Sequence, residues 1–283
     1  MRTVRTMAAA VVALLAATAV YAEDGWELSL GAGVVGEPVY EGARDYYATP
    51  IPTVDLSWTS GGLSLSASIL DGLGVTYVHE PTRLLAMASL NSGASRERDG
   101  YSLVVVPVEH TARTERLLEG TPDATGILAA DATLGYITPV GLVGVTAGYR
   151  PTRLEYPAGG SSEETHQGFL YSLLYMIGLP VTDRIEVSTI ALLEAMDGRY
   201  ADAWYTVQTD TAALDEFDAQ AGLLRTRFVL DSTAMISERF GISLMAAQTV
   251  LLGDAARSPY TERQFQTSVI LSSFYSFGWG GRT

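Results

Sequence analysis

Apolar side chains occupy alternate positions along most of the chain, with serine, threonine, glycine or a charge between them. Residues 63–69 read Leu-Ser-Leu-Ser-Ala-Ser-Ile, and residues 143–150 read Val-Gly-Val-Thr-Ala-Gly-Tyr-Arg. Successive side chains of a β-strand point to opposite faces, so each such segment has one apolar and one polar face. Many segments are about ten residues long and are separated by polar turns, which is typical of a transmembrane barrel. We therefore expect an all-β, antiparallel up-and-down barrel, apolar toward lipid and polar toward its lumen.

The alternation predicts about twelve strands, with ten as the alternative. Residues 62–78 could form one long strand or two strands joined by a hairpin, because Asp71-Gly72 is a strong hairpin signal. The apolar residues of this stretch are odd-numbered, and a two-residue hairpin would put Leu73 on the serine face. We therefore expect one long strand there, with Gly72 and Gly74 allowing a kink or bulge. The predicted strands are roughly 25–35, 48–58, 62–78, 83–91, 101–112, 126–137, 141–150, 166–178, 184–195, 219–232, 239–252 and 264–277.

An even number of strands places both chain termini on the periplasmic side of a bacterial barrel. Short connections are then expected on the periplasmic side and long polar connections outside, which is the usual asymmetry of such barrels. The short ones are 59–61, 138–140 and 179–183, and the long ones are 36–47, 113–125, 151–165, 196–218 and 253–263.

Residues 1–22 resemble a signal peptide. Arg2 and Arg5 precede an apolar run that is too short to span a bilayer as a helix, and Val20-Tyr21-Ala22 is a suitable cleavage site. The alternative is an N-terminal membrane anchor. We expect export to the outer membrane, with residues 23–283 forming one barrel domain.

The rest of the chain contains no apolar stretch of 18 residues. A closed barrel would then be its only way to span a membrane.

The composition excludes cysteine chemistry and argues against nucleic-acid binding. The chain has no cysteine, which excludes disulfides, thiol nucleophiles and cysteine-based metal sites. The net charge is −14 and all 18 basic residues are arginine, so nucleic-acid binding is not expected. The acidic excess fits solvated loops, including the acidic residues that cluster between 197 and 218.

Catalytic chemistry is weakly represented. The three histidines are His79, His110 and His166, and Glu109-His110 is the only adjacent acid–histidine pair. Neighbouring residues of a strand point to opposite faces, so this pair could not cooperate within a strand. We expect no enzyme activity, no catalytic or metal-binding residues and no cofactor. A barrel lipid hydrolase using His110 is a minor alternative.

Two motifs and two shorter stretches stand out in the sequence. The motifs are Pro38-x-Tyr40-Glu41-Gly42-x-x-x-Tyr46-x-x-x-Pro50-x-Pro52 and Leu251-Leu252-Gly253-Asp254-Ala255-Ala256-Arg257-Ser258-Pro259. The shorter stretches are residues 200–207 and the end of the final strand, Tyr275-Ser276-Phe277. Together they resemble the MipA/OmpV family of outer-membrane proteins, in which a stretch similar to residues 200–207 lies in a surface loop.

Both motifs have the chemistry of loops. Pro50 and Pro52 cannot donate to a ladder, which suits a strand entrance or edge. Gly253-Asp254 and Ser258-Pro259 favour turns. We expect these segments to plug or brace the barrel mouth, and not to bind a ligand.

The resemblance implies a scaffolding role. The partners would be periplasmic murein-remodelling enzymes, a lytic transglycosylase and a murein synthase. The final strand, Val269 to Phe277, resembles the C-terminal signal by which the barrel-insertion machinery recognises its substrates. Outer-membrane lipid or lipopolysaccharide would surround the barrel.

Two alternatives stay open. The first is a small solute channel, because twelve strands can enclose either a narrow pore or a filled interior. Its path would be lined by the charged residues predicted to face the lumen: Asp55, Asp131, Arg150, Glu186 and Arg227. The second is a soluble periplasmic β-sandwich.

Overall fold

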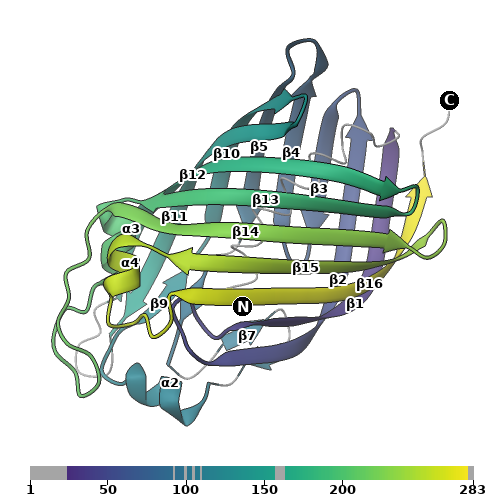
Figure 1. Cartoon of the computed structure of the whole chain (residues 1–283). Helices are drawn as coiled ribbons and strands as arrows, with labels where there is room; N and C mark the ends of the chain where they lie inside the picture. The colour runs from purple at the N-terminus through teal and green to yellow at the C-terminus, as the bar shows by residue number, and fades with distance from the viewer. Residues whose placement is uncertain are drawn as a thin grey trace.

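The chain forms a closed antiparallel barrel of twelve strands (Figure 1). The computed structural model describes residues 24–91, 93–98, 101–103, 106–108, 110–156 and 163–279. The predicted signal peptide and Glu109 lie outside these residues. Strand β1 (Gly25–Pro38) pairs with β2 (Tyr46–Ser60) and with β16 (Phe265–Trp279), and pairing of β10 (Ala129–Thr138) with β11 (Gly141–Glu155) completes the ring. The predicted fold is therefore confirmed.

The other wall strands follow chain order, and each is antiparallel to its neighbours. They are β3 (Leu63–Ser68), β4 (Gly72–His79), β5 (Leu84–Asn91), β12 (Glu163–Thr182), β13 (Ile185–Met196), β14 (Gly222–Met235) and β15 (Phe240–Leu251). Two short strands, β6 (Ser95–Arg96) and β9 (Asp123–Gly126), pair with each other, and β9 also pairs with β11. They extend the wall beyond β5 and β10.

The two ends of the barrel differ. The end that carries both termini has short connections at 61–62, 80–83, 139–140, 183–184 and 236–239; we call it the turn end. The opposite end, the loop end, carries the long connections with helices α2 (Ala112–Leu117), α3 (Gly198–Tyr205) and α4 (Gly253–Arg257) (Figure 1). This asymmetry confirms the predicted alternation of short and long connections.

The prediction of one long strand over 62–78 is wrong. Residues 69–71 form a turn, and β3 and β4 pair with Leu63 opposite Tyr77 and Ser68 opposite Gly72. A three-residue loop joins odd-numbered residues to odd-numbered partners, so both strands keep their apolar residues on one face. The two-residue hairpin considered above would have inverted that pattern. Gly72 has φ +80°, which a glycine adopts without strain.

The strand predicted over 101–112 is also wrong. Residues 101–103 (β7) pair only with 106–108 (β8) among the described residues, and α2 begins at Ala112. The Thr111 side chain accepts a hydrogen bond from the backbone N–H of Thr114 and so caps this helix. The predicted number of strands is thus correct because one missed strand and one false strand cancel.

The β3–β4 hairpin reaches only part of the way along β2. In the described residues β3 pairs with Asp55–Ser60, and the carbonyl of Val54 accepts the last hydrogen bond, from Ile69 N at 3.0 Å. Pro50 and Pro52 share the parity of Val54, so their backbones face this same edge beyond the end of β3. A proline has no N–H to leave unpaired at a free edge, which explains its place here.

The outer face of the wall is an apolar belt. Leu134 is 66% exposed, and Val145, Leu173, Phe228 and Leu271 are also exposed. Aromatic side chains lie toward both ends, with Trp26 and Trp58 6.4 Å apart between ring centroids near the turn end, and Tyr149 and Phe169 5.3 Å apart nearer the loops. An apolar band with aromatic girdles is the surface of a barrel that spans a membrane.

No helix in the described residues is long and apolar enough to cross a membrane.

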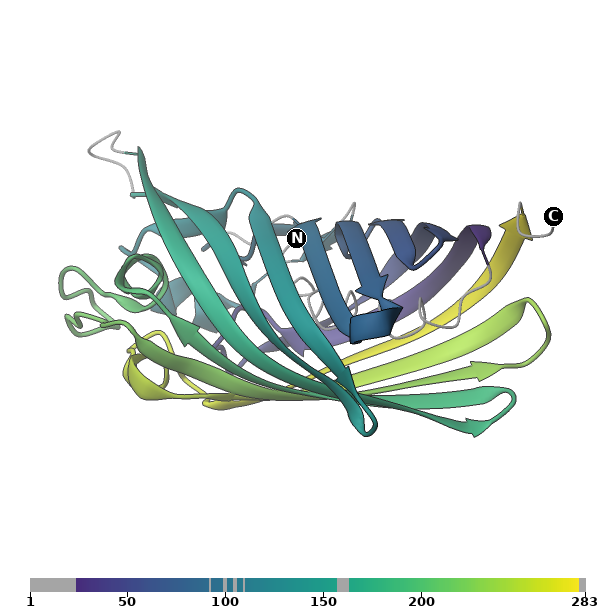
Figure 2. The same cartoon turned by 90° about the horizontal axis from the view of Figure 1, so that it is seen from above.

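The interior is polar only in part, whereas we predicted a polar lumen throughout. Asp131, Arg225 and Arg227 are buried there, but inward-facing apolar side chains from both sides of the barrel also form one buried cluster. In Figure 2, β2–β5 lie across from β12–β15. Side chains from these facing walls belong to the same buried cluster. The cluster comprises Val35, Ile51, Val78, Leu85, Met87, Leu142, Leu174, Met176, Ile190, Val229, Met245, Ala247 and Ile270.

A charge on the apolar belt tests this orientation. Leu134→Arg should destabilise the folded barrel in lipid by about 2–4 kcal/mol, the cost of an arginine near the bilayer midplane. Val140, 65% exposed but in a turn, is the matched control, and Val140→Arg should have little effect. Urea unfolding of the refolded protein in vesicles measures both. Equal effects would contradict a lipid-facing position for Leu134.

Candidate functional site

Four connections at the loop end fold together over the barrel mouth. We call residues 39–45, 110–121, 197–221 and 252–264 the plug. Two buried clusters hold it: one joins α3 to inward-facing residues of the wall, and the other joins 39–45 to Leu118, Leu214 and Tyr260. Segments far apart in sequence therefore form one packed body.

Helix α3 is the part of the plug that enters the mouth. The Asp197 side chain caps it by accepting a hydrogen bond from Tyr200 N at 2.8 Å. Its buried face carries Tyr200, Trp204 and Tyr205, which pack against wall residues of β11–β13. The Trp204 indole N–H donates to Thr152 Oγ1 on β11 at 3.0 Å. The helix is thus fixed by both apolar packing and a polar contact.

The segments that contain the two stronger family motifs contact each other. The Tyr40 hydroxyl donates to the carbonyl of Tyr260 at 3.1 Å. Gln266, at the start of β16, accepts from Gly42 N and donates to the carbonyl of Ala43, each at 2.9 Å. Gly42 has φ +98°, and a Cβ there would lie 2.8 Å from Thr261 Oγ1, so a larger residue would be strained.

The third family stretch joins the same assembly. Ser258, in the second motif, donates through its hydroxyl to the carbonyl of Tyr205 at 2.7 Å. The Tyr205 hydroxyl in turn donates to Glu41 Oε1 at 3.1 Å. Burial, together with the nearby Glu41 carboxylate, raises the pKa of the Tyr205 hydroxyl well above its ordinary value, so it stays a donor.

A buried arginine of the wall ties the plug to the barrel. Arg225 on β14 is 0% exposed; its Nη2 donates to Glu194 Oε1 at 3.0 Å, and its Nε pairs with the other oxygen of Glu194. Its Nη1 pairs with Glu41 of the plug. One guanidinium therefore pairs with two carboxylates, one on the wall and one on a loop. Such a buried group of three charges is stable only when every member is present.

Helix α2 is held by a carboxylate of loop 39–45. Asp45 accepts hydrogen bonds from the hydroxyls of Thr111 and Thr114, the latter at 3.0 Å. The Thr111 hydrogen bond is the main cause that lowers the pKa of Asp45, with a further contribution from Thr114. Asp45 thus links two plug loops in its ionised form.

The five residues predicted to face the lumen do not gather at one point. Asp131 and Arg150 form an ion pair with 2.7 Å between Oδ1 and Nη2. Arg227 is buried and its Nε donates to Thr249 at 3.1 Å. Asp55 on β2 and Glu186 on β13 belong to strands on different sides of the barrel.

The motif residues are divided between wall and plug. Pro38 ends β1 opposite Tyr46, whose hydroxyl accepts from Thr267 N at 3.0 Å. Gly253 and Asp254 begin α4, where Asp254 accepts from Gln220 N at 2.9 Å and pairs with Arg257. Their observed partners are protein groups of the plug and the wall.

Sequence reasoning missed the residues that hold the plug. Only Arg227 was predicted to face the lumen, although the alternation of the strand turns Arg225 to the same face. Glu41 lies inside a family motif but had no predicted role, and Gln266 had no sequence signal. The available signal was an arginine, Arg225, and a glutamate, Glu194, on adjacent predicted strands.

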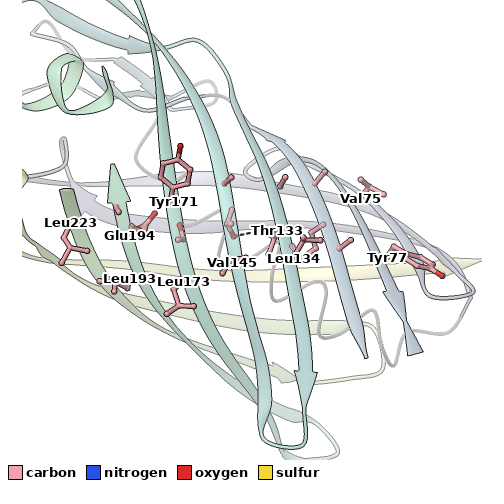
Figure 3. Close-up of a pocket in the computed structure, with 18 residues that line it drawn as sticks. Val75, Tyr77, Thr133, Leu134, Val145, Tyr171, Leu173, Leu193, Glu194 and Leu223 are labelled. Atoms are coloured by element: carbon pink, nitrogen blue, oxygen red, sulfur yellow. Dashed lines mark hydrogen bonds between the residues drawn. The ribbon is translucent and has the colours of Figure 1, made fainter. Parts of the chain in front are cut away.

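An apolar groove lies on the outside of the wall (Figure 3). It has a volume of about 910 Å³ and crosses β4, β5, β10, β11, β12 and β13. The exposed side chains of Val75, Tyr77, Leu134 and Val145 line it. It belongs to the lipid-facing belt and is not a path through the lumen.

The histidines are dispersed. His79 lies at a turn beside Thr82, and His110 lies near the carbonyl of Arg98. His166 lies 3.3 Å from Asp202 and 3.6 Å from Glu164. No group of three or more acidic or histidine side chains in the described residues is arranged to hold a metal ion.

These features define a membrane-spanning β-barrel whose mouth is closed by its own loops. The chain belongs to the MltA-interacting protein MipA family, a sequence profile of which matches residues 30–277. The resemblance found in the sequence is thereby confirmed. A search of curated proteins finds no match.

Solved structures with similarity to this chain are also barrels. The translocator domain of autotransporter NalP from Neisseria meningitidis is 12% identical, with 96% of this chain and 95% of that chain covered and a TM-score of 0.46. The CymD monoaromatic hydrocarbon channel is 12% identical, with coverage of 95% and 92% and a TM-score of 0.44. The Pseudomonas putida toluene transporter TodX is 11% identical, with coverage of 93% and 91% and a TM-score of 0.42. At this level the similarities do not bear on function.

The contacts of Arg225 with Glu194 and Glu41, which we call the Arg225 latch, give a stability prediction. Arg225→Met leaves two buried carboxylates without a cation and should cost about 3–5 kcal/mol. Adding Glu194→Gln and Glu41→Gln should recover much of the loss. Arg257→Met removes a solvent-exposed ion pair and should cost about 1 kcal/mol or less. Denaturant unfolding measures all of them, and a mild Arg225→Met effect would refute the latch.

The Asp45 contact gives a pH prediction. Because its pKa is lowered in the folded protein, its stabilisation is full above the ordinary carboxyl pKa of about 3.9 and disappears as the pH falls through the folded value. The protection factors of the α2 amides, measured by hydrogen exchange relative to the unprotected chain at the same pH, should therefore fall in acid. Asp45→Asn should remove that pH dependence, whereas Asp215→Asn in an exposed part of the plug should keep it.

Proposed function

We propose that this protein is a non-catalytic barrel of the outer membrane that anchors murein-remodelling enzymes. The family name supports this, because it describes an interaction with MltA, and the partner class would be a lytic transglycosylase together with a murein synthase. The single observation that carries the proposal is the closed mouth: the plug is held to the wall by an ion pair, and an apolar cluster of inward-facing side chains lies below it.

The docking surface would lie at the turn end. Barrels of this class direct short turns and both termini to the periplasm, where murein enzymes act. The turns present exposed charges of both signs, among them Arg83, Arg184 and Arg239. A polar rim of this kind fits a reversible, charge-steered contact with a soluble domain.

The first test is a binding experiment with the folded barrel in detergent and a purified lytic transglycosylase. Arg83→Glu, Arg184→Glu and Arg239→Glu together should abolish capture, because they reverse the cationic part of the turn-end rim. The matched control reverses three exposed arginines of the loop end, Arg44, Arg116 and Arg199, and should bind normally. Equal binding by all three proteins would remove the turn end as the docking surface.

The second test is electrical. In a planar bilayer the folded protein should conduct no steady current, since the plug covers the mouth and apolar side chains of facing walls cluster inside. Stable, ion-selective steps would instead support the solute-channel alternative. Charge reversal at Asp55 and Glu186 would then be expected to change the selectivity.

A further inference from the structure

A second buried arginine lies beside the plug, on β6, and has no carboxylate partner in the described residues. Arg96 on β6 is 3% exposed. Its Nη1 donates to the carbonyl of Trp204, and its guanidinium carbon lies 3.7 Å from the centroid of the Tyr260 ring. In the part of the chain that the structure describes, Nε and Nη2 have no hydrogen-bond partner, and no carboxylate pairs with this arginine. A buried cation in this state is costly unless an anion meets it.

Arg96 borders a small enclosed cavity of about 20 Å³. That volume is enough for about one water-sized guest. The cavity is lined by residues of three segments, which are loop 39–45, residues 94–96 with β6, and helix α3: Tyr40, Glu41, Ala94, Ser95, Arg96, Tyr200, Trp204 and Tyr205. Larger anions such as phosphate or a peptide carboxylate do not fit.

Glu41 is the one carboxylate at this cavity, and its oxygens are engaged elsewhere. Oε1 accepts from Tyr205 and Oε2 pairs with Arg225. Arg225 also pairs with Glu194, and no oxygen of Glu41 in the described structure pairs with Arg96. The two free N–H donors of the buried Arg96 guanidinium therefore need an acceptor in the cavity, and a monatomic anion can accept from both.

We propose that this cavity binds a single halide ion, chloride under physiological conditions, through the free N–H groups of Arg96. The ion supplies the counter-charge of the buried guanidinium. By doing so it completes the junction between β6, α3, the segment after α4 and loop 39–45. Chloride then acts as a structural ligand of the plug, independently of any murein partner.

Thermal unfolding of the folded full-length barrel tests the site. Melting temperature should rise saturably when chloride replaces gluconate at constant ionic strength. Arg96→Gln should weaken the apparent chloride affinity about tenfold or more, since a charged hydrogen bond is lost. The exposed Arg257→Gln variant should respond like the parent protein, and heat-modified gel mobility checks that each variant is folded.

Bromide provides a readout that needs no variant. Crystals of the parent protein grown in bromide should show an anomalous peak beside the Arg96 guanidinium. If chloride and gluconate give the same unfolding curve and no peak lies there, a water molecule occupies the cavity and the proposal is overturned. A chloride effect that persists in Arg96→Gln would place the ion elsewhere and also overturn it.

Discussion

The structure depends on one constraint: in a lipid-facing wall every backbone N–H and C=O group needs a partner within the protein. Closure of the sheet through β10 and β11 meets this requirement around the ring. The same constraint explains a local detail of β2. Where the short β3–β4 hairpin ends, the edge of β2 carries Pro50 and Pro52, which have no N–H to satisfy. Alternating side chains then follow from closure, since one face of each strand meets lipid and the other meets the interior.

The interior combines apolar and ionic contacts. A buried apolar cluster joins facing walls, and ion pairs lie toward the loop end, where Asp131 pairs with Arg150, and Arg225 pairs with Glu194 and Glu41. Ion pairs in such a place need complete pairing, because a single unpaired charge is strongly destabilising. The plug therefore cannot move away without exposing the wall's arginine and glutamate. That coupling makes the loop end a fixed structure.

The segments that carried the family resemblance converge in space. More than half of the chain separates loop 39–45 from helix α3 and from the turn after α4, yet the three segments contact one another through Tyr40, Tyr205 and Ser258. The motif residues of these segments contact one another at the barrel mouth, and the motifs therefore contribute to its closure. A scaffold that presents its periplasmic face is consistent with a barrel whose opposite face is closed.

The sequence by itself determined the barrel, the lipid-facing residues and the asymmetry of its ends, because a two-residue period and turn chemistry are local properties of the chain. It could not decide the hairpin at 69–71, since loops of two and three residues suit the same turn signal and only the register of the neighbouring strands selects one. It also predicted a lumen that is polar throughout, because alternation does not say which inward-facing side chains meet across the barrel. The apolar cluster that joins facing walls, the Arg225 latch and the meeting of distant motifs were decided by tertiary structure alone, since each depends on contacts between strands and loops that the sequence separates.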